Sequence, residues 1–236
     1  MSLGMIALVG IDGSGKTTQA HRVADELAAA GVRAAYRRNA GGRHWFGRVA
    51  GWFGRSDAEQ LLGRRGMLFV ESVLRWLAIL RTLLRRAFTG GTVVMDRYAF
   101  CQYASLRARG AKPAAERRAR LAYRFFPAPD ITFFLDVSPQ VAHDRIEARG
   151  YDSETMEYLE SARAAYLGLP EAASFVVINA DGTPDEVSAA IHAELRRRSA
   201  VEPAQPAPRS VRGMILAGGP LVAALAVAGY QLAEAL

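Results

Sequence analysis

The stretch Gly10-Ile11-Asp12-Gly13-Ser14-Gly15-Lys16-Thr17 decides the fold of this chain. It has the spacing Gly-x4-Gly-Lys-[Ser/Thr] of a phosphate-binding loop. In such a loop the glycines let successive backbone N–H groups turn towards an anion, the lysine reaches the β- and γ-phosphates, and the hydroxyl can ligate Mg²⁺. We therefore expect ATP and Mg²⁺ to bind at this loop, through Gly10, Asp12, Gly13, Ser14, Gly15, Lys16, Thr17 and Thr18.

The flanking residues place this loop in the setting that the motif requires. Met5-Ile6-Ala7-Leu8-Val9 is a short apolar run typical of a buried parallel strand. The segment from Thr18 to Ala30 predicts a helix that ends before Gly31. Strand, glycine-rich turn and helix in this order distinguish the motif from an ordinary glycine-rich surface turn.

Strands and helices alternate along most of the chain. Further strands are expected at residues 32–36, 92–95, 130–137 and 175–178. Helices are expected at residues 60–88, 99–109, 113–125, 139–149, 153–167 and 183–198, with Ser153 capping the helix that begins there. This alternation predicts an α/β fold, with a parallel sheet of about five strands and helices on both faces, over residues 1–198.

The composition restricts the partners and the compartment. The 236 residues carry a formal net charge of +7, which suits anionic partners such as nucleotide phosphates or a membrane surface. The absence of an arginine-rich run with interleaved aromatics argues against nucleic acid. One cysteine, Cys101, and an N-terminal apolar run that leads straight into the phosphate loop predict a cytoplasmic catalytic domain without a signal peptide.

The C-terminal part differs from the rest of the chain. Residues 199–212 contain three prolines and predict a linker, and residues 213–236 form an apolar tail without charge as far as Tyr230. As a helix, Met214 to Tyr230 would span about 26 Å, against a hydrocarbon thickness of about 30 Å. The basic flank before it favours a membrane anchor, but an interfacial or partner-docking helix and a soluble or disordered tail stay open.

Apolar residues in two further segments, 60–88 and 44–58, can be explained either by packing or by a functional contact. The predicted helix at residues 60–88 has apolar residues every three to four positions, so we expect it to pack on the core. The same helix is also the candidate interface of a homodimer. The aromatic residues within 44–58 either fill the base of a loop or cover an active site, and packing is the commoner role of such clusters.

Four motifs together make the chain resemble the thymidylate kinase family over about residues 5–198. They are Ile11 to Gln19, Asp96-Arg97-Tyr98, Pro129 to Val137, and Val177 to Val187. Many nucleotide-binding proteins share the first motif, whereas the combination is much more specific. The resemblance implies a kinase of nucleoside monophosphates, most simply one that converts dTMP to dTDP.

The resemblance also implies roles for the residues at the phosphates. Lys16 would hold the donor phosphates, and Thr17 and Asp96 would hold Mg²⁺. Arg97 would bridge donor and acceptor, and Asp12 would lie against the acceptor sugar. Because the acceptor is itself a phosphate, the reaction needs positioning and charge neutralisation but no general base.

In the resembling enzymes, an arginine from the phosphate loop or from a lid stabilises the transferring phosphoryl group. Position 14 is Ser, so the lid would supply it through Arg145 or Arg149, although two solvated arginines on a helix are the simpler interpretation. The adenine would lie on the loop of Asn179, Ala180 and Asp181.

The acceptor side matches the family less well. Arg38, Phe69 and Tyr98 are the matching acceptor-binding candidates. The arginine that reads the base in the family is Val73 here, and the family's serine after Asp-Arg-Tyr is Cys101. Two alternative functions therefore stay open. One is the same chemistry with a different acceptor, and the other is a membrane-tethered ATP-binding module with a regulatory role.

Overall fold

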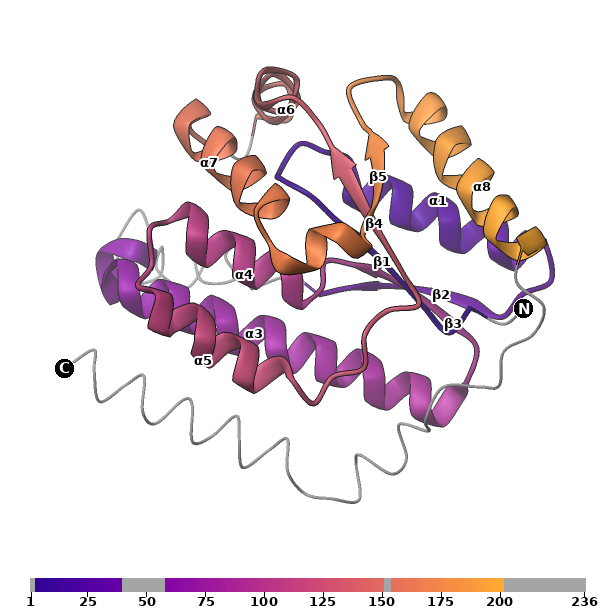
Figure 1. The fold of residues 1–236 in the computed structure, drawn as a ribbon, viewed down its shortest axis with the longest axis horizontal. Helices are drawn as coiled ribbons and strands as arrows, with labels where there is room; N and C mark the ends of the chain where they lie inside the picture. The colour runs from indigo at the N-terminus through magenta and orange to yellow at the C-terminus, as the bar shows by residue number, and fades with distance from the viewer. Residues whose placement is uncertain (1–2, 40–57, 151–153, 202–236) are drawn as a thin grey trace.

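The computed structural model describes residues 3–39, 58–150 and 154–201, and these ranges form a parallel sheet flanked by helices (Figure 1). The sheet has five strands in the order β2-β3-β1-β4-β5. The strands are β1 (Met5–Val9), β2 (Ala34–Arg38), β3 (Thr92–Asp96), β4 (Ile131–Asp136) and β5 (Val176–Asn179). The helices are α1 (Lys16–Ala29), α3 (Ala58–Thr89), α4 (Ala99–Ala108), α5 (Pro113–Tyr123), α6 (Pro139–Glu147), α7 (Met156–Leu167), the 3₁₀ helix η1 (Pro170–Ser174) and α8 (Pro184–Val201).

The central strand β1 organises the sheet. All five of its residues are buried, and it pairs with β3 on one side and β4 on the other, with Ile6 opposite both Val94 and Ile131. Strands β2 and β3 lie on one side of β1, and the later strands β4 and β5 lie on the other side. The direction in which the sheet is extended therefore reverses at β1. Open α/β sheets bind their ligands at this point, beyond the carboxyl ends of the strands.

Helices cover both faces of the sheet, as the sequence predicts. On one face α1 contacts β1, β2 and β3, and α8 contacts α1 and β5. On the other side α4 contacts α3, α5 and α7, and α6 packs on α7 (Figure 1). This arrangement buries the apolar residues of β1, β3 and β4 from both sides.

The predicted elements are present, with shifted boundaries. Helix α1 begins at Lys16 rather than Thr18, so the phosphate-loop lysine and threonine lie in its first turn. Thr155, not Ser153, caps α7, because its hydroxyl accepts a hydrogen bond from the Tyr158 backbone N–H at 3.2 Å. Helix α8 continues to Val201, three residues past the predicted end of the domain at 198.

The predicted linker and apolar tail, and most of the aromatic segment at 44–58, lie outside the described residues. Within the ranges that are described, no helix has both the length and the apolar character needed to cross a membrane.

Candidate active site

The loop between β1 and α1 owes its shape to glycines at two demanding positions. Gly13 has a φ of 83°, and a Cβ atom there would lie 2.5 Å from the carbonyl oxygen of Ala142 in α6. Gly15 has a φ of 85° and is the residue that precedes α1. Side chains are strained at such φ values, so glycine is needed at both positions. The loop thus lies directly against α6 and leads straight into the N-terminus of α1.

Lys16 lies folded onto this loop. Its side chain is buried, and its ammonium donates to the Ile11 carbonyl and, at 3.4 Å, to the Ser14 hydroxyl. Asp12 Oδ1 lies 3.7 Å from the ammonium. Burial lowers the pKa of Lys16 and Arg97 lowers it further, whereas the carboxylates of Asp12 and Asp96 oppose that change. The ammonium is therefore held beside the place where anionic phosphates would bind.

Asp12 also pairs with Arg97, the residue after β3. The two side chains form an ion pair that joins the phosphate loop to the end of the neighbouring strand. Burial alone would lower the pKa of Arg97, but the Asp12 carboxylate overrides this and the pKa lies well above its ordinary value. Arg97 is thus a permanent positive charge next to the loop, as the predicted bridge between two phosphates requires.

Thr17 and Asp96 meet as the predicted Mg²⁺ site requires. The Thr17 hydroxyl donates to Asp96 Oδ2 at 2.6 Å, and the Tyr36 hydroxyl reaches the same oxygen at 3.3 Å. Asp96 Oδ1 is buried and has no hydrogen-bond partner among the described residues. A hydroxyl and a carboxylate oxygen are the ligand types that Mg²⁺ prefers, and an unpartnered buried carboxylate oxygen fits a cation.

A pocket connects the phosphate loop with the loop after β5. It is lined by Gly13, Ser14, Gly15, Thr18, Gln19, Arg145, Arg149, Ala180, Gly182, Pro184 and Val187. The loop at 179–182 is held in place by its own polar groups: Asn179 Oδ1 accepts from the Asp181 N–H at 3.0 Å, and Asp181 Oδ1 accepts from the Ser138 N–H at 2.7 Å. Of the predicted phosphate and adenine residues, the structure therefore places Gly13, Ser14, Gly15, Thr18 and Ala180 around one cavity.

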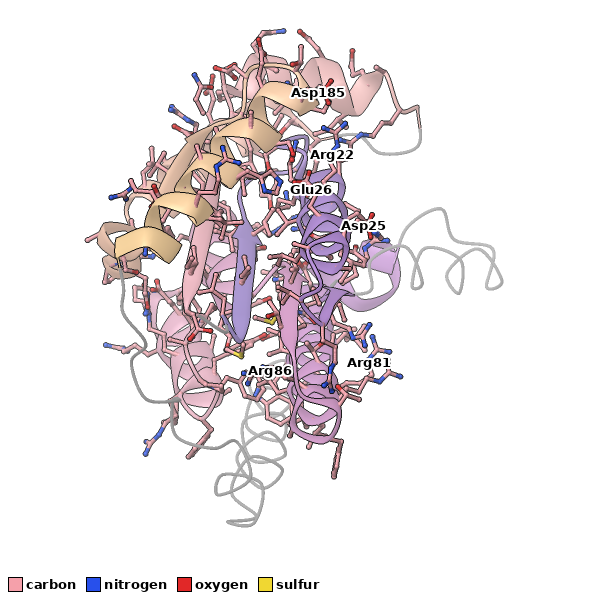
Figure 2. The ribbon with its side chains drawn as sticks, turned by 90° about the vertical axis from the view of Figure 1, so that its right-hand side faces the viewer. Arg22, Asp25, Glu26, Arg81, Arg86 and Asp185 are labelled. Carbon is pink, nitrogen blue, oxygen red and sulfur yellow. The ribbon has the colours of Figure 1, made fainter. Side chains whose placement is uncertain are left out.

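Helices α1 and α8 close one side of this pocket. Gln19 of α1 is buried and donates to the Pro184 carbonyl at 2.7 Å. One turn further along, Arg22 donates to the same carbonyl and pairs with Asp185 at 2.6 Å (Figure 2). These bonds fix the start of α8 relative to the phosphate loop.

The two predicted lid arginines differ in their surroundings. Arg145 donates to three backbone carbonyls, those of Ala180 at 2.8 Å, Asp181 at 3.0 Å and Gly182 at 2.7 Å. Its guanidinium therefore supports the loop at 179–182. The side chain of Arg149 makes no hydrogen bond or ion pair with any part of the chain that the structure describes, and it lines the same pocket. Of the two, Arg149 is the arginine left to meet a phosphate.

The acceptor candidates do not form a comparable cluster. Arg38 is exposed at the end of β2, and Phe69 is half-buried on α3. Tyr98 is buried in the core and donates its hydroxyl to the Pro127 carbonyl at 2.5 Å. Its hydroxyl is thus already bonded within the core, and the acceptor contact that the resemblance implies stays a prediction.

Three buried polar residues lie between α3 and α4 instead. Arg75 donates to Glu71 at 2.7 Å and to Gln102 at 2.6 Å, and the exposed fractions of the three residues are 3%, 5% and 0%. Among the residues that the structure describes, Arg75 Nε and Gln102 Nε2 are buried and have no hydrogen-bond partner. Arg75 follows Val73, the residue at the position of the family's base-reading arginine, by two positions along α3.

Six polar residues around these candidate sites had no predicted role. They are Gln19, Tyr36, Asn39, Glu71, Arg75 and Gln102. Most belong to no motif and act through tertiary contacts. One sequence signal could have indicated the polar residues on α3. Glu71 and Arg75 are polar but occupy positions that the apolar periodicity of the helix assigns to the core. They are four positions apart and therefore share a helix face.

Comparisons with known proteins agree with this geometry. The family model of thymidylate kinase matches residues 8–191. The chain is similar to a probable thymidylate kinase of Archaeoglobus fulgidus, with 32% identity over 78% of this chain and 90% of the relative. It is similar to the thymidylate kinase of Xanthomonas euvesicatoria pv. vesicatoria, with 34% identity over 80% of this chain and 81% of the relative. The thymidylate kinase of Caulobacter vibrioides is 32% identical over 79% of this chain and 92% of its own.

Proposed function

The chain belongs to the thymidylate kinase family of nucleoside-monophosphate kinases, and from this premise we propose that it transfers the γ-phosphate of ATP to dTMP. The products are dTDP and ADP. The observation that carries this proposal is a pair of contacts between the segment after β1 and the end of β3. Asp12 of the phosphate loop pairs with Arg97, and Thr17 bonds to Asp96. Both pairs lie where the sheet changes its direction of winding.

The chain's own residues supply the positive charge that phosphoryl transfer requires. Lys16 is buried next to the loop N–H groups, and it leaves the Ile11 carbonyl to meet the donor phosphates. Arg97 lies between the donor loop and the acceptor side and contacts oxygens of both phosphates. Arg149, in the turn after α6, approaches the transferring group, since Ser14 leaves the loop without an arginine. Such an arginine raises the turnover of related phosphotransferases by about 10³- to 10⁵-fold.

Thr17 and Asp96 are the residues that would hold Mg²⁺. When bound, the ion neutralises the charge that develops on the β- and γ-phosphate oxygens. The Thr17 hydroxyl directs its proton to Asp96 Oδ2 and its lone pairs away from it, and in the described part of the chain no group bonds to Asp96 Oδ1. Asp12 keeps its place against the acceptor sugar, and Asn179, Ala180 and Asp181 line the adenine.

A coupled assay of ADP release across the common nucleoside monophosphates tests the proposal. We expect turnover with dTMP, and we expect Lys16→Ala to abolish it while the fold is retained. Absence of turnover with every nucleoside monophosphate, with ATP still bound, would favour the regulatory ATP-binding module instead.

A different acceptor is the second candidate, and the polar groups on this side of the sheet favour it. Val73 cannot donate a hydrogen bond to a base, and the nearby Glu71–Arg75–Gln102 cluster holds two buried donors that no described residue pairs. Changes in hydrogen-bonding groups of this kind alter discrimination between substrates by about 10⁴- to 10⁵-fold. The same assay decides, because this candidate predicts a higher kcat/KM for an acceptor other than dTMP.

The exposed side of α3 supports a homodimer. Leu77 and Phe88 have exposed fractions of 47% and 83%, and a spacing of about three turns puts them on the same side of the helix. Light scattering should report a dimer for the wild type and a monomer for Leu77→Glu. Leu121→Glu on α5 is the matched control, because Leu121 is 50% exposed, and it should leave the dimer intact. A monomeric wild type would contradict the assignment.

Residues 213–230 are charge-free and follow a basic segment, which supports a contact of the tail with a membrane. Flotation with vesicles that contain anionic lipid should recover the full chain, and a chain that ends at Ser199 should stay at the bottom of the gradient. Equal recovery of both chains would contradict this contact.

A further inference from the structure

Tyr36 lies on the edge strand β2 with its side chain over the end of β3. Tyr36 is paired in register with Val94, and Arg38 with Asp96, so Tyr36 is the diagonal neighbour of Asp96 on the same face of the sheet. Helix α1 covers β2 and β3 and brings Thr17 to this place. Three elements therefore meet at one carboxylate.

The two hydroxyls that reach this carboxylate use the same oxygen. Thr17 donates to Asp96 Oδ2 at 2.6 Å and Tyr36 donates to it at 3.3 Å. Asp96 is buried, with an exposed fraction of 1%, and no residue in the described ranges bonds to its Oδ1. A carboxylate held by two donors on one oxygen cannot rotate freely, so the other oxygen keeps a fixed direction.

The ring of Tyr36 is itself held in place. His21 of α1, one turn after Thr17, stacks on it with ring centroids 3.6 Å apart and an interplanar angle of 26°. Burial, the Asp96 carboxylate and the hydrogen bond to it raise the pKa of Tyr36 to about 12. The hydroxyl therefore stays protonated and continues to donate at any physiological pH.

We propose that Tyr36 is a positioning residue for the metal–ATP site: with Thr17 it fixes Oδ2 of Asp96 and so presents Oδ1 to the divalent cation. This inference rests on the proposed function, because it concerns the cation that would accompany ATP. It goes beyond it by assigning a role to a residue that belongs to none of the motifs.

Binding of Mn²⁺ in the presence of a non-hydrolysable ATP analogue tests this role without any turnover. Free Mn²⁺ is measured by electron paramagnetic resonance for the wild type, for Tyr36→Phe and for Tyr123→Phe. Tyr123 is a matched control, because its hydroxyl also makes one hydrogen bond of 3.3 Å, to the Ser72 carbonyl between α5 and α3. Tyr36→Phe keeps the stacked ring and removes only the hydroxyl.

The metal dissociation constant should rise about 10-fold in Tyr36→Phe, the size typical of lost partners of metal ligands, and stay within about twofold in Tyr123→Phe. Melting temperatures without metal should fall by similar amounts in the two variants, which separates a metal effect from a loss of stability. In the kinase assay, a higher Mg²⁺ concentration should restore most of the turnover of Tyr36→Phe.

Two results would overturn the inference. If Tyr36→Phe binds Mn²⁺ as tightly as the wild type does, the hydroxyl has no role towards the metal, although the proposed function is unaffected. If the wild type binds no Mn²⁺ with the ATP analogue, both the inference and the proposed function fail.

Discussion

Asn39 donates its side-chain amide to the backbone carbonyl of Arg97 at 2.9 Å, and the Asn39 backbone N–H donates to the Asp96 carbonyl at the same distance. Arg97 has a φ of 76°, a value that non-glycine residues rarely adopt. Thr82 of α3 donates to Asn39 Oδ1 at 3.0 Å and so fixes the orientation of the amide. The fully buried Asn39 therefore holds the strained backbone that aims Arg97 at the phosphate loop.

Replacing Asn39 with Ala should remove this support. The change leaves the Arg97 carbonyl and the Thr82 hydroxyl without their partner, which costs about 1–3 kcal/mol of unfolding free energy. The KM for the acceptor should also rise, because Arg97 loses its fixed direction. Thr82→Val removes only the hydroxyl donor and should have a smaller effect on both quantities. Urea unfolding measures the free energy of unfolding, and steady-state kinetics measure the KM for the acceptor. Equal effects of the two substitutions would contradict the role of the Asn39 amide in holding Arg97.

Gly13→Ala should destroy ATP binding through a backbone collision. The new Cβ atom would lie 2.5 Å from the Ala142 carbonyl oxygen and 2.8 Å from the Ala142 Cα, which no side-chain rotation can relieve. Gly31→Ala is the matched control, because its φ of 79° is similar and nothing lies within 4 Å of the new Cβ atom. We expect a cost of about 1–2 kcal/mol for Gly31→Ala from backbone strain alone. Calorimetric titration with ATP should show binding in that control and none in Gly13→Ala.

Arg145 and Arg149 should separate into two roles. Arg145→Ala removes three hydrogen bonds to the loop at 180–182, so the KM for ATP should rise and the melting temperature should fall. Arg149→Ala should leave the melting temperature unchanged and reduce kcat at least about 100-fold, because an arginine at the transferring phosphoryl group is lost. Arg197→Ala, on the surface of α8, controls for the loss of an arginine side chain. A loss of kcat in Arg145→Ala alone would reverse the assignment.

The stability of the protein should decline between pH 10 and pH 12. The pKa of Tyr36 is raised to about 12, so the folded state holds this proton more tightly than the unfolded chain does. Its contribution is therefore complete below pH 10 and is lost as the pH rises through 12. Burial raises the pKa of Tyr98, Tyr103 and Tyr123 in the same direction. Urea midpoints measured across this range should fall less steeply for Tyr36→Phe than for the wild type, and identical slopes would refute the assignment.

The motifs predicted which residues of the phosphate loop and of β3 lie together, because local sequence determines their arrangement. A glycine-rich turn between a buried strand and a helix can place its N–H groups, Lys16 and Thr17 in only one way. Asp96 ends β3, the strand next to β1, and Arg97 follows it, so parallel pairing brings both to the same edge of the sheet as the phosphate loop. The alternation of elements likewise predicted the five strands and the helices on both faces.

The contacts of the Glu71–Arg75–Gln102 cluster and of Asn39 could not be predicted in the same way, because they join residues far apart in the sequence. Arg75 is 27 positions from Gln102, and Asn39 is 58 positions from Arg97. No periodicity indicates that a buried arginine on α3 meets an amide on α4. Arg145 illustrates the limit on the donor side: its position on the helix was predicted, but its three carbonyl partners depend on how the loop after β5 folds over α6.

The ADP-release assay with dTMP as acceptor tests the central claim most directly, provided that a parallel series of other nucleoside monophosphates is measured. Saturable turnover with dTMP that depends on Mg²⁺ and disappears in Lys16→Ala is the predicted result. ATP binding without turnover on any nucleoside monophosphate would contradict it.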